Sequence, residues 1–220
     1  MMDSEWGPLA ALVGSWEGDG GIDTAYSHHH GKIVCTPYRE RATFEPFGPV
    51  HNGRQQLFGL DYRAAMWRGH ETVPFHAEVG YWLWDPESGE VLRAFVVPRG
   101  ISVLAGGTAA AGDRELWVEA QRDDANYAIG ENRYLAARAT SLSYRAAIVT
   151  SADDTWSYQA TTTLKLSQLA ATFGHSDRNT LHRVASMSDP RNRGESLPTL
   201  TGRAWPHVAE RPPANTALGP

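Results

Sequence analysis

The sequence of 220 residues has a single cysteine, Cys35, so no disulfide can form within the chain. Such a composition fits a reducing compartment. A lone cysteine also needs a base partner before it can act as a nucleophile, and the sequence identifies none for Cys35. These two points argue against a disulfide-stabilised fold and against cysteine-dependent catalysis.

Long apolar runs and an excess of basic residues are also missing. No stretch reaches the roughly 20 apolar residues of a membrane span, and the opening residues MMDSEWGPLAALVG lack the basic region and apolar core of a signal peptide. The formal net charge of -5 leaves no surplus of cations to neutralise nucleic-acid phosphates. We therefore predict a cytoplasmic protein that binds neither membranes nor nucleic acids.

Helix signals are few, and strand signals are many. Pro8 to Leu12 can form one short helical turn, because proline is favoured at helix starts. Beyond it, short extended runs alternate with turn residues at intervals of roughly ten residues, which is typical of an antiparallel barrel or sandwich. With the opening stretch there are about ten or eleven candidate strands; the others are Arg41–Phe47, Gln55–Met66, Phe75–Trp84, Val91–Val97, Ile101–Leu104, Glu115–Ala120, Ala125–Gly130, Tyr134–Ala139, Ser141–Thr150 and Trp156–Leu166.

The last of these runs and the C-terminal composition define the expected domain. In residues 156–166 apolar and polar side chains alternate, and Tyr158 falls on the apolar face, so it is predicted to point inward. Five of the 13 prolines lie in the final 25 residues, where little periodicity remains. We predict one β-barrel domain over residues 1–185, with a C-terminal extension from residue 167, and a flexible tail over residues 186–220.

Residues 12–20, LVGSWEGDG, set Trp16 among glycines at the first strand. In an antiparallel barrel such an indole can close one end, while the glycines let the backbone bend and cross closely. The short helix before it would complete the plug. The combination predicts a small closed barrel with an interior of ligand size.

Five stretches, in this order, resemble motifs of the nitrobindins, a haem-binding β-barrel family. LVGSWEGDG resembles their L-x-G-x-W-x-G-x-G opening, PFHAEVGYW (74–82) their H-x-E-x-G-Y signature and LSYRAAI (142–148) their L-x-Y-x-x-x-M strand. PYRERATF (37–44) and VPRGIS (97–102) resemble two further segments. The resemblance covers roughly residues 8–166 and implies an all-β, ten-stranded, calycin-like barrel with an N-terminal helical plug.

The same resemblance implies a cofactor and a chemistry. Nitrobindins hold a ferric haem b in a solvent-facing pocket, ligated by one histidine near the last strand. They bind nitric oxide reversibly, and several isomerise peroxynitrite to nitrate. Such a site needs one axial donor, an open sixth position and an apolar wall.

Carried over residue by residue, the ligand positions are only partly filled. Counting from the tyrosine of the L-x-Y strand places the proximal histidine on Tyr158, and the distal segment falls near Lys32 and Ile33. A tyrosinate can ligate ferric haem when an arginine helps it ionise, and Arg145, Arg99 and Arg133 are candidates. Alternatively, Tyr158 only fills the cavity, or His76 is the ligand or lines the pocket.

Three other polar groups are candidates for lining the pocket. In a strand, His76 and Glu78 share one face, so a buried Glu78 is expected to pair with an arginine such as Arg93 or Arg99. The run His28–His30 is either solvated or close to the haem edge. Residues 174–184, GHSDRNTLHRV, either form a turn and a capping segment or fold over the barrel mouth and contribute His175.

The leading interpretation is a haem-binding barrel that acts on nitric oxide or peroxynitrite. The alternative is a haem-free carrier or sensor of a small apolar ligand, with an internal arginine for a ligand carboxylate. A third reading is an enzyme that uses His76 and Glu78 as acid and base, and a fourth is a non-haem metal site with histidines such as His70. A barrel edge is the expected place for a homodimer contact, although no residue pattern specifies one.

Overall fold

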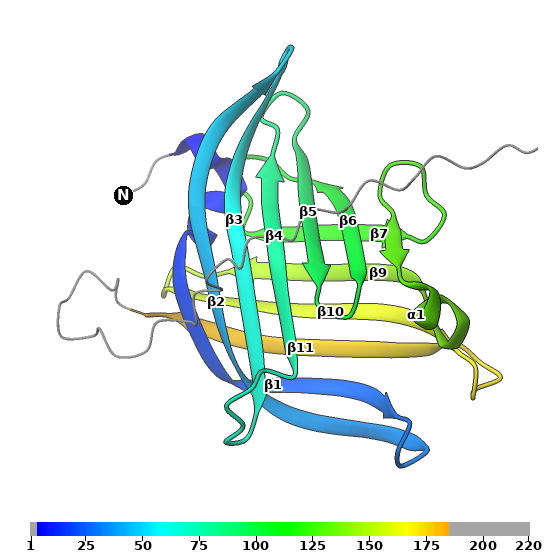
Figure 1. The fold of residues 1–220 in the computed structure, drawn as a ribbon. Coiled ribbons are helices and arrows are strands. Elements are labelled where there is room, and N and C mark those ends of the chain that lie inside the picture. The colour runs from blue at the N-terminus through cyan, green and yellow to red at the C-terminus, as the bar shows by residue number, and fades with distance from the viewer. Residues whose placement is uncertain (1–3, 185–220) are drawn as a thin grey trace, which may run out of the picture. The chain divides into compact units, whose positions relative to one another are not determined.

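The computed structural model describes residues 4–184, and in this range the chain forms an antiparallel β-barrel (Figure 1). Ten strands make up the ring: β1 (Gly14–Ser27), β2 (Lys32–Asn52), β3 (Gln55–Arg68), β4 (His76–Trp84), β5 (Glu90–Val97), β6 (Ile101–Thr108), β7 (Glu115–Gln121), β9 (Ala139–Thr150), β10 (Thr155–Leu166) and β11 (Phe173–Arg183). The short strand β8 (Ile129–Glu131) pairs with β6.

Hydrogen bonding between neighbours runs around the ring without a free edge. From β1 to β7 each strand pairs with the next, β7 pairs with β9, and β9, β10 and β11 follow in order. Pairing of β11 with β1 closes the barrel. In Figure 1, β3 to β6 run steeply across β9, β10 and β11, so two walls enclose the interior. The predicted ten-stranded, calycin-like barrel is confirmed.

The plug at one end follows the prediction as well. The 3-10 helix η1 (Ser4–Leu12) precedes β1, and its Leu9 and Leu12 are fully buried. The indole of Trp16 is 1% exposed and donates its N–H to the carbonyl of Leu12 at 2.7 Å. Directly beyond, the β1–β2 register shifts between Gly18 and Gly21. A Cβ at Gly21 would run into the ring of Tyr38, so a glycine is required there.

Three local predictions were wrong. Residues 134–139 are not a strand: most of them belong to the helix α1 (Arg133–Arg138), because the Asn132 side chain accepts from two backbone N–H groups of the first turn and caps it. The predicted strand over residues 125–130 is reduced to β8. Residues 173–183 form a full strand instead of a turn with a capping segment.

Alternation along the strands separates an apolar interior from a polar exterior. Tyr158 and the other apolar-face residues of β10 do point inward, as predicted, and line the interior. In the part of the chain that is described, no helix is long and apolar enough to cross a membrane. The predicted tail, residues 186–220, lies outside the described residues.

Candidate functional site

A cavity of about 290 Å³ occupies the interior of the barrel. Its apolar wall comes from strands on both sides of the ring and from α1, and includes Val97, Ile101, Leu135, Leu164 and Leu166. The exposed side chains of Arg68 and Arg99 also line it, and they mark the side that opens to solvent. Polar residues line the rest of the cavity, and many of them belong to two hydrogen-bonded clusters and one pair in the barrel interior.

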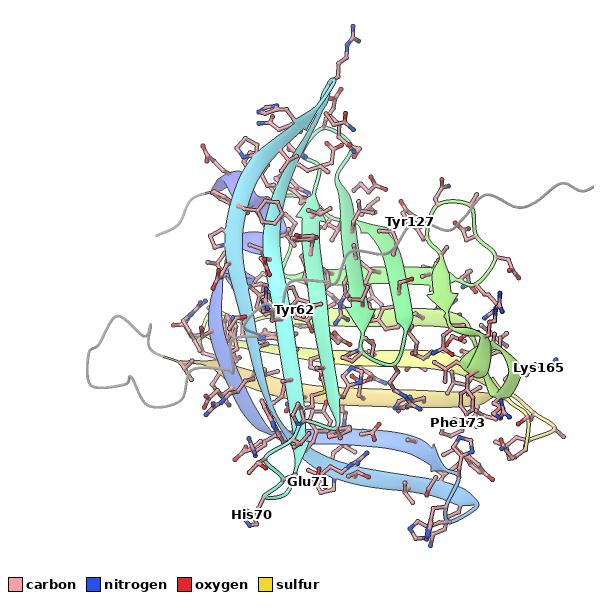
Figure 2. The ribbon with its side chains drawn as sticks, in the orientation of Figure 1. Tyr62, His70, Glu71, Tyr127, Lys165 and Phe173 are labelled. Carbon is pink, nitrogen blue, oxygen red and sulfur yellow. The ribbon has the colours of Figure 1, made fainter. Side chains whose placement is uncertain are left out.

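The first cluster surrounds the buried guanidinium of Arg93 on β5. Arg93 Nη2 donates to Glu78 Oε2 at 2.6 Å and to the hydroxyl of Tyr62 at 3.1 Å, and Nη1 donates to the hydroxyl of Tyr144. Tyr62, labelled on β3 in Figure 2, donates to Glu78 Oε2 at 2.8 Å. His76 Nε2 lies 3.1 Å from Glu78 Oε1. We call these five residues the Arg93 cluster.

Charge pairing fixes the protonation of the Arg93 cluster. Burial alone would raise the pKa of Glu78, but the guanidinium of Arg93 and the hydrogen bond from His76 lower it to about 2. Burial lowers the pKa of His76, and its contact with Glu78 more than offsets this, so the net shift is upward. Burial also raises the pKa of the Tyr62 and Tyr144 hydroxyls, which keep their protons. The predicted pairing of Glu78 with an arginine is confirmed, with Arg93 as the partner.

The second cluster surrounds Glu40, which points inward from β2 and is 2% exposed. Glu40 Oε2 accepts from the Tyr158 hydroxyl at 2.9 Å and from the Asn179 amide at 3.0 Å. Tyr158 also shares a hydrogen bond of 2.8 Å with the hydroxyl of Tyr38. The other carboxyl oxygen, Oε1, is buried without a partner among the described residues. We call Tyr38, Glu40, Tyr158 and Asn179 the Glu40 cluster.

Within residues 4–184 the side chains that donate to Glu40 are neutral, and the pKa shifts in this cluster follow from that. Burial raises the pKa of Glu40 to about 7, and the hydrogen bonds from Asn179 and Tyr158 only partly counter it. Burial and the nearby Glu40 carboxylate raise the pKa of Tyr158 well above its ordinary value. Tyr158 is therefore a neutral phenol in a hydrogen-bond chain.

The polar pair lies on the two strands that close the barrel. His175 Nε2 on β11 lies 2.7 Å from Asp23 Oδ1 on β1, and both residues line the cavity. The Asp23 side chain is 8% exposed and that of His175 is 38% exposed, so the histidine also faces the open side. Asp177, two residues further along β11, lines the cavity too, and burial raises its pKa to about 6.

Most of the residues selected from the sequence meet in this cavity. Glu78, His76, Tyr158, Arg99 and His175 all line it, and so does His28 from the β1–β2 hairpin. His29 and His30 are exposed. Figure 2 labels Phe173 at the start of β11, two residues before His175 in the sequence, and Lys165 close to the end of β10.

Three selected residues lie elsewhere. Arg145 points outward, because the inward positions of β9 are its neighbours Tyr144 and Ala146, and it pairs with Glu119 on the outer surface at 3.2 Å. Lys32 and Ile33 are exposed on β2 beside the hairpin and are not among the lining residues. The count that selected them assumed family spacing across a hairpin whose length is free to vary.

Sequence reasoning missed Asp23, Asp177, Glu40 and Tyr38 as interior residues. The signal existed for Tyr38 and Glu40, which alternate with half-buried Arg39 and exposed Arg41 in β2. It was obscured because the acid and the two arginines in PYRERATF are typical of a polar strand. Among residues 4–184, no group of three or more His, Cys, Asp or Glu side chains is arranged to hold a metal ion.

A closed barrel with a polar-lined internal cavity defines a ligand-binding β-barrel protein. The chain belongs to the THAP4-like, heme-binding beta-barrel domain family, whose model matches residues 5–183. The match includes β11, so the family domain extends beyond residue 166, where the sequence resemblance stopped. The nitrobindin-like resemblance is confirmed at the level of this family.

Among solved structures, the chain is similar to Rv2717c from M. tuberculosis, with 22% identity and a TM-score of 0.57. The similarity covers 80% of this chain and 95% of that one. At this identity it shows the shared fold alone. No curated protein matches the sequence.

Proposed function

We propose that the cavity binds a haem b and that His175 is its protein ligand. The observation that carries the proposal is the His175–Asp23 pair, which places a histidine with a carboxylate partner on the strand that closes a haem-binding family barrel. The resemblance implies one histidine near the last strand, and the last strand of this ring is β11. His175 therefore takes the role that counting along the sequence gave to Tyr158.

The cavity lining suits a haem in two respects. Its apolar wall, with Val97, Ile101 and Leu164, would cover the porphyrin and exclude water from it. Arg68 and Arg99 stand at the open side, where carboxylate groups on a haem edge would meet cations. A single protein ligand also agrees with the lack of a multi-residue metal site among the described residues.

Asp23 supplies what an iron-ligating histidine needs from its surroundings. A carboxylate that accepts a hydrogen bond from one ring N–H fixes the tautomer and orientation of the imidazole and raises its basicity. The Asp23 contact occupies Nε2 and leaves Nδ1 of His175 without a partner among the described residues. A ring flip exchanges the two nitrogens.

The other two candidate ligands are already engaged. The Tyr158 hydroxyl bonds to Glu40 and Tyr38, and the carboxylate at its side opposes the phenolate that iron would need. His76 is held by Glu78 at 3.1 Å within the Arg93 cluster. Both assignments stay predictions, and the contacts favour His175 over them.

We further propose nitric oxide as the small ligand and peroxynitrite as a substrate, since family resemblance implies both. A bound ferric haem would supply reversible nitric oxide binding and the isomerisation of peroxynitrite to nitrate. The chain would contribute the imidazole of His175 and the apolar wall that excludes water. A haem-free carrier of an apolar ligand, a cytoplasmic location and a homodimer stay predictions.

The direct experiment is a hemin titration of the full-length chain, followed in the Soret region and then by addition of nitric oxide. We expect a saturable one-to-one Soret shift and a second shift with nitric oxide that reverses when the gas is removed. Peroxynitrite decay, with nitrate measured as product, tests the enzymatic part. No saturable hemin shift would overturn the proposal and favour the carrier.

A further inference from the structure

The indole N–H groups of this protein divide into two sets. In residues 4–184, Trp6, Trp16, Trp67 and Trp84 donate to backbone carbonyls at 2.7–3.2 Å, and Trp117 donates to Glu115 at 2.9 Å. The N–H groups of Trp82 and Trp156 have no acceptor among the described residues. These two side chains are 2% and 4% exposed, and they are the tryptophans that line the cavity.

Two more unused donors belong to the Arg93 cluster. The two terminal nitrogens of Arg93 are taken by Glu78, Tyr62 and Tyr144, but its Nε is buried without a partner. Tyr144 accepts from Arg93, and its own hydroxyl hydrogen has no acceptor among residues 4–184. Because burial raises the pKa of Tyr144, this hydroxyl keeps the proton that it can donate.

The residues that carry the unused donors all line the same cavity. Trp82 and Arg93 are directly opposite each other on β4 and β5, and Arg93 Cζ lies 5.4 Å from the Trp82 ring and 5.7 Å from the Tyr144 ring. Trp156 comes from the other wall, on β10. The ring of Phe44 packs between Trp156 and Tyr62 of the Arg93 cluster, with ring-centroid distances of 5.5 Å to Trp156 and 5.0 Å to Tyr62.

Buried donors of this kind cost free energy unless something accepts from them, so an acceptor is expected in this part of the cavity. Glu78 cannot be that acceptor for all of them, because Oε2 already accepts from Tyr62 and Arg93 and Oε1 faces His76. Arg93 and His76 also offset the charge of Glu78. A ligand that suits the site carries acceptor oxygens, a negative charge and no hydrogen of its own.

We propose that this part of the cavity is a binding subsite for a small planar oxyanion, either a free anion such as nitrate or the carboxylate head of an apolar molecule. Its oxygens accept from Trp82 Nε1, Arg93 Nε and the Tyr144 hydroxyl, with Trp156 Nε1 as the donor from the facing wall. The subsite contains neither His175 nor Asp23, so it does not depend on haem binding.

The test uses indole ¹H–¹⁵N spectra of the full-length chain without added hemin. Sodium nitrate, sodium formate and sodium octanoate are titrated separately, with sodium chloride as the ionic-strength control. We expect saturable shifts of the Trp82 and Trp156 signals. The signal of Trp84 should not shift, because its N–H donates to the carbonyl of Ala109. Tighter binding of octanoate than formate would identify a carboxylate head group; tighter binding of nitrate than both carboxylates would identify a free anion.

Variants that remove one N–H and keep an aromatic ring separate the subsite from general packing. Trp82→Phe should weaken binding roughly tenfold, as the loss of one hydrogen bond to a charged group predicts. Trp156→Phe should weaken it less, and Trp84→Phe should leave it unchanged. The remaining indole signals report whether each variant is folded. The proposal would be overturned if none of the three anions produced saturable shifts, or if Trp82→Phe and the parent chain bound the anion with equal affinity. Water would then be the acceptor.

Discussion

Two glutamates are buried in one barrel, and they behave in opposite ways. Glu78 is 8% exposed and its pKa falls to about 2, whereas Glu40 is 2% exposed and its pKa rises to about 7. Both accept hydrogen bonds from a tyrosine hydroxyl at 2.8–2.9 Å. The difference is the cation: Glu78 contacts Arg93, while the second donor of Glu40 is the neutral amide of Asn179.

The comparison shows that hydrogen bonds from neutral groups do not keep a carboxylate ionised at this depth. Burial disfavours the charged form of both side chains, and in Glu78 the guanidinium of Arg93, together with His76, reverses the effect. With a pKa of about 7, Glu40 gains or loses its proton close to neutral pH. One side of the interior therefore contains a fixed ion pair, Glu78–Arg93, and the other contains a carboxyl group, Glu40, that titrates near neutral pH.

The largest effect is expected from removing the cation. Arg93→Met removes the guanidinium from the buried carboxylate of Glu78, and we expect a loss of about 3–5 kcal/mol in the free energy of unfolding. Urea denaturation at pH 7 measures it. The matched control is the double variant Arg93→Met with Glu78→Gln, which should recover much of the loss because no uncompensated charge remains. Equal losses in the single and double variants would show that packing, and not charge, dominates.

The pH dependence of stability tests the Glu40 cluster. Glu40 titrates near 7 in the folded protein and near 4.5 when unfolded, so the folded chain binds the proton more tightly between these values. Its stabilising contribution is complete below about pH 4.5 and is lost as the pH rises through 7. Glu40→Gln should flatten the fall in unfolding free energy between pH 5 and 8, by at most about 3 kcal/mol.

Some slope should remain in Glu40→Gln, because the raised pKa of Asp177, about 6, acts in the same direction. Urea midpoints at several pH values, converted to free energies, give the two slopes. A variant whose stability falls with pH as steeply as that of the parent chain would show that Glu40 is ionised throughout.

A smaller effect is expected when the hydrogen-bond chain is shortened. Tyr158→Phe removes the bonds to Glu40 and Tyr38 and keeps the ring that stacks on Trp156 at 5.3 Å. We expect a loss of about 1–2 kcal/mol in the free energy of unfolding. Thermal and urea unfolding measure it. A neutral result would mean that water replaces the hydroxyl.

The smallest effect concerns an ion pair on the outer surface. Arg145 and Glu119 are 3.2 Å apart, with side chains 69% and 57% exposed. Arg145→Ala should change the free energy of unfolding by no more than about 0.5 kcal/mol. A loss as large as that in Arg93→Met would contradict the view that burial makes the interior pair important.

The barrel could be predicted because its signals are local. Turn residues mark the strand ends, alternation marks the inward face of β10, and glycines beside Trp16 mark the plug. The helix α1 escaped prediction because one capping residue, Asn132, decides it. Strand β11 escaped because GHSDRNTLHRV is polar on both faces, and only pairing with β1 and β10 makes it a strand.

The site could be predicted only in part, for a related reason. His76 and Glu78 lie two apart in one strand, so their shared face follows from the sequence. His175 and Asp23 are 152 residues apart, and barrel closure alone brings them together. Counting to Tyr158 treated β10 as the last strand, whereas β11 follows it and closes the ring. Tyr158 and His175, the two candidate ligands, therefore lie on neighbouring strands.

The most direct test of the central claim is a hemin titration of His175→Ala and Tyr158→Phe side by side. His182→Ala is the matched control, because His182 lies on the same strand with an exposed side chain. We expect the one-to-one Soret shift to be lost or displaced in His175→Ala and kept in Tyr158→Phe and His182→Ala. Loss in Tyr158→Phe with an unchanged shift in His175→Ala would contradict the account.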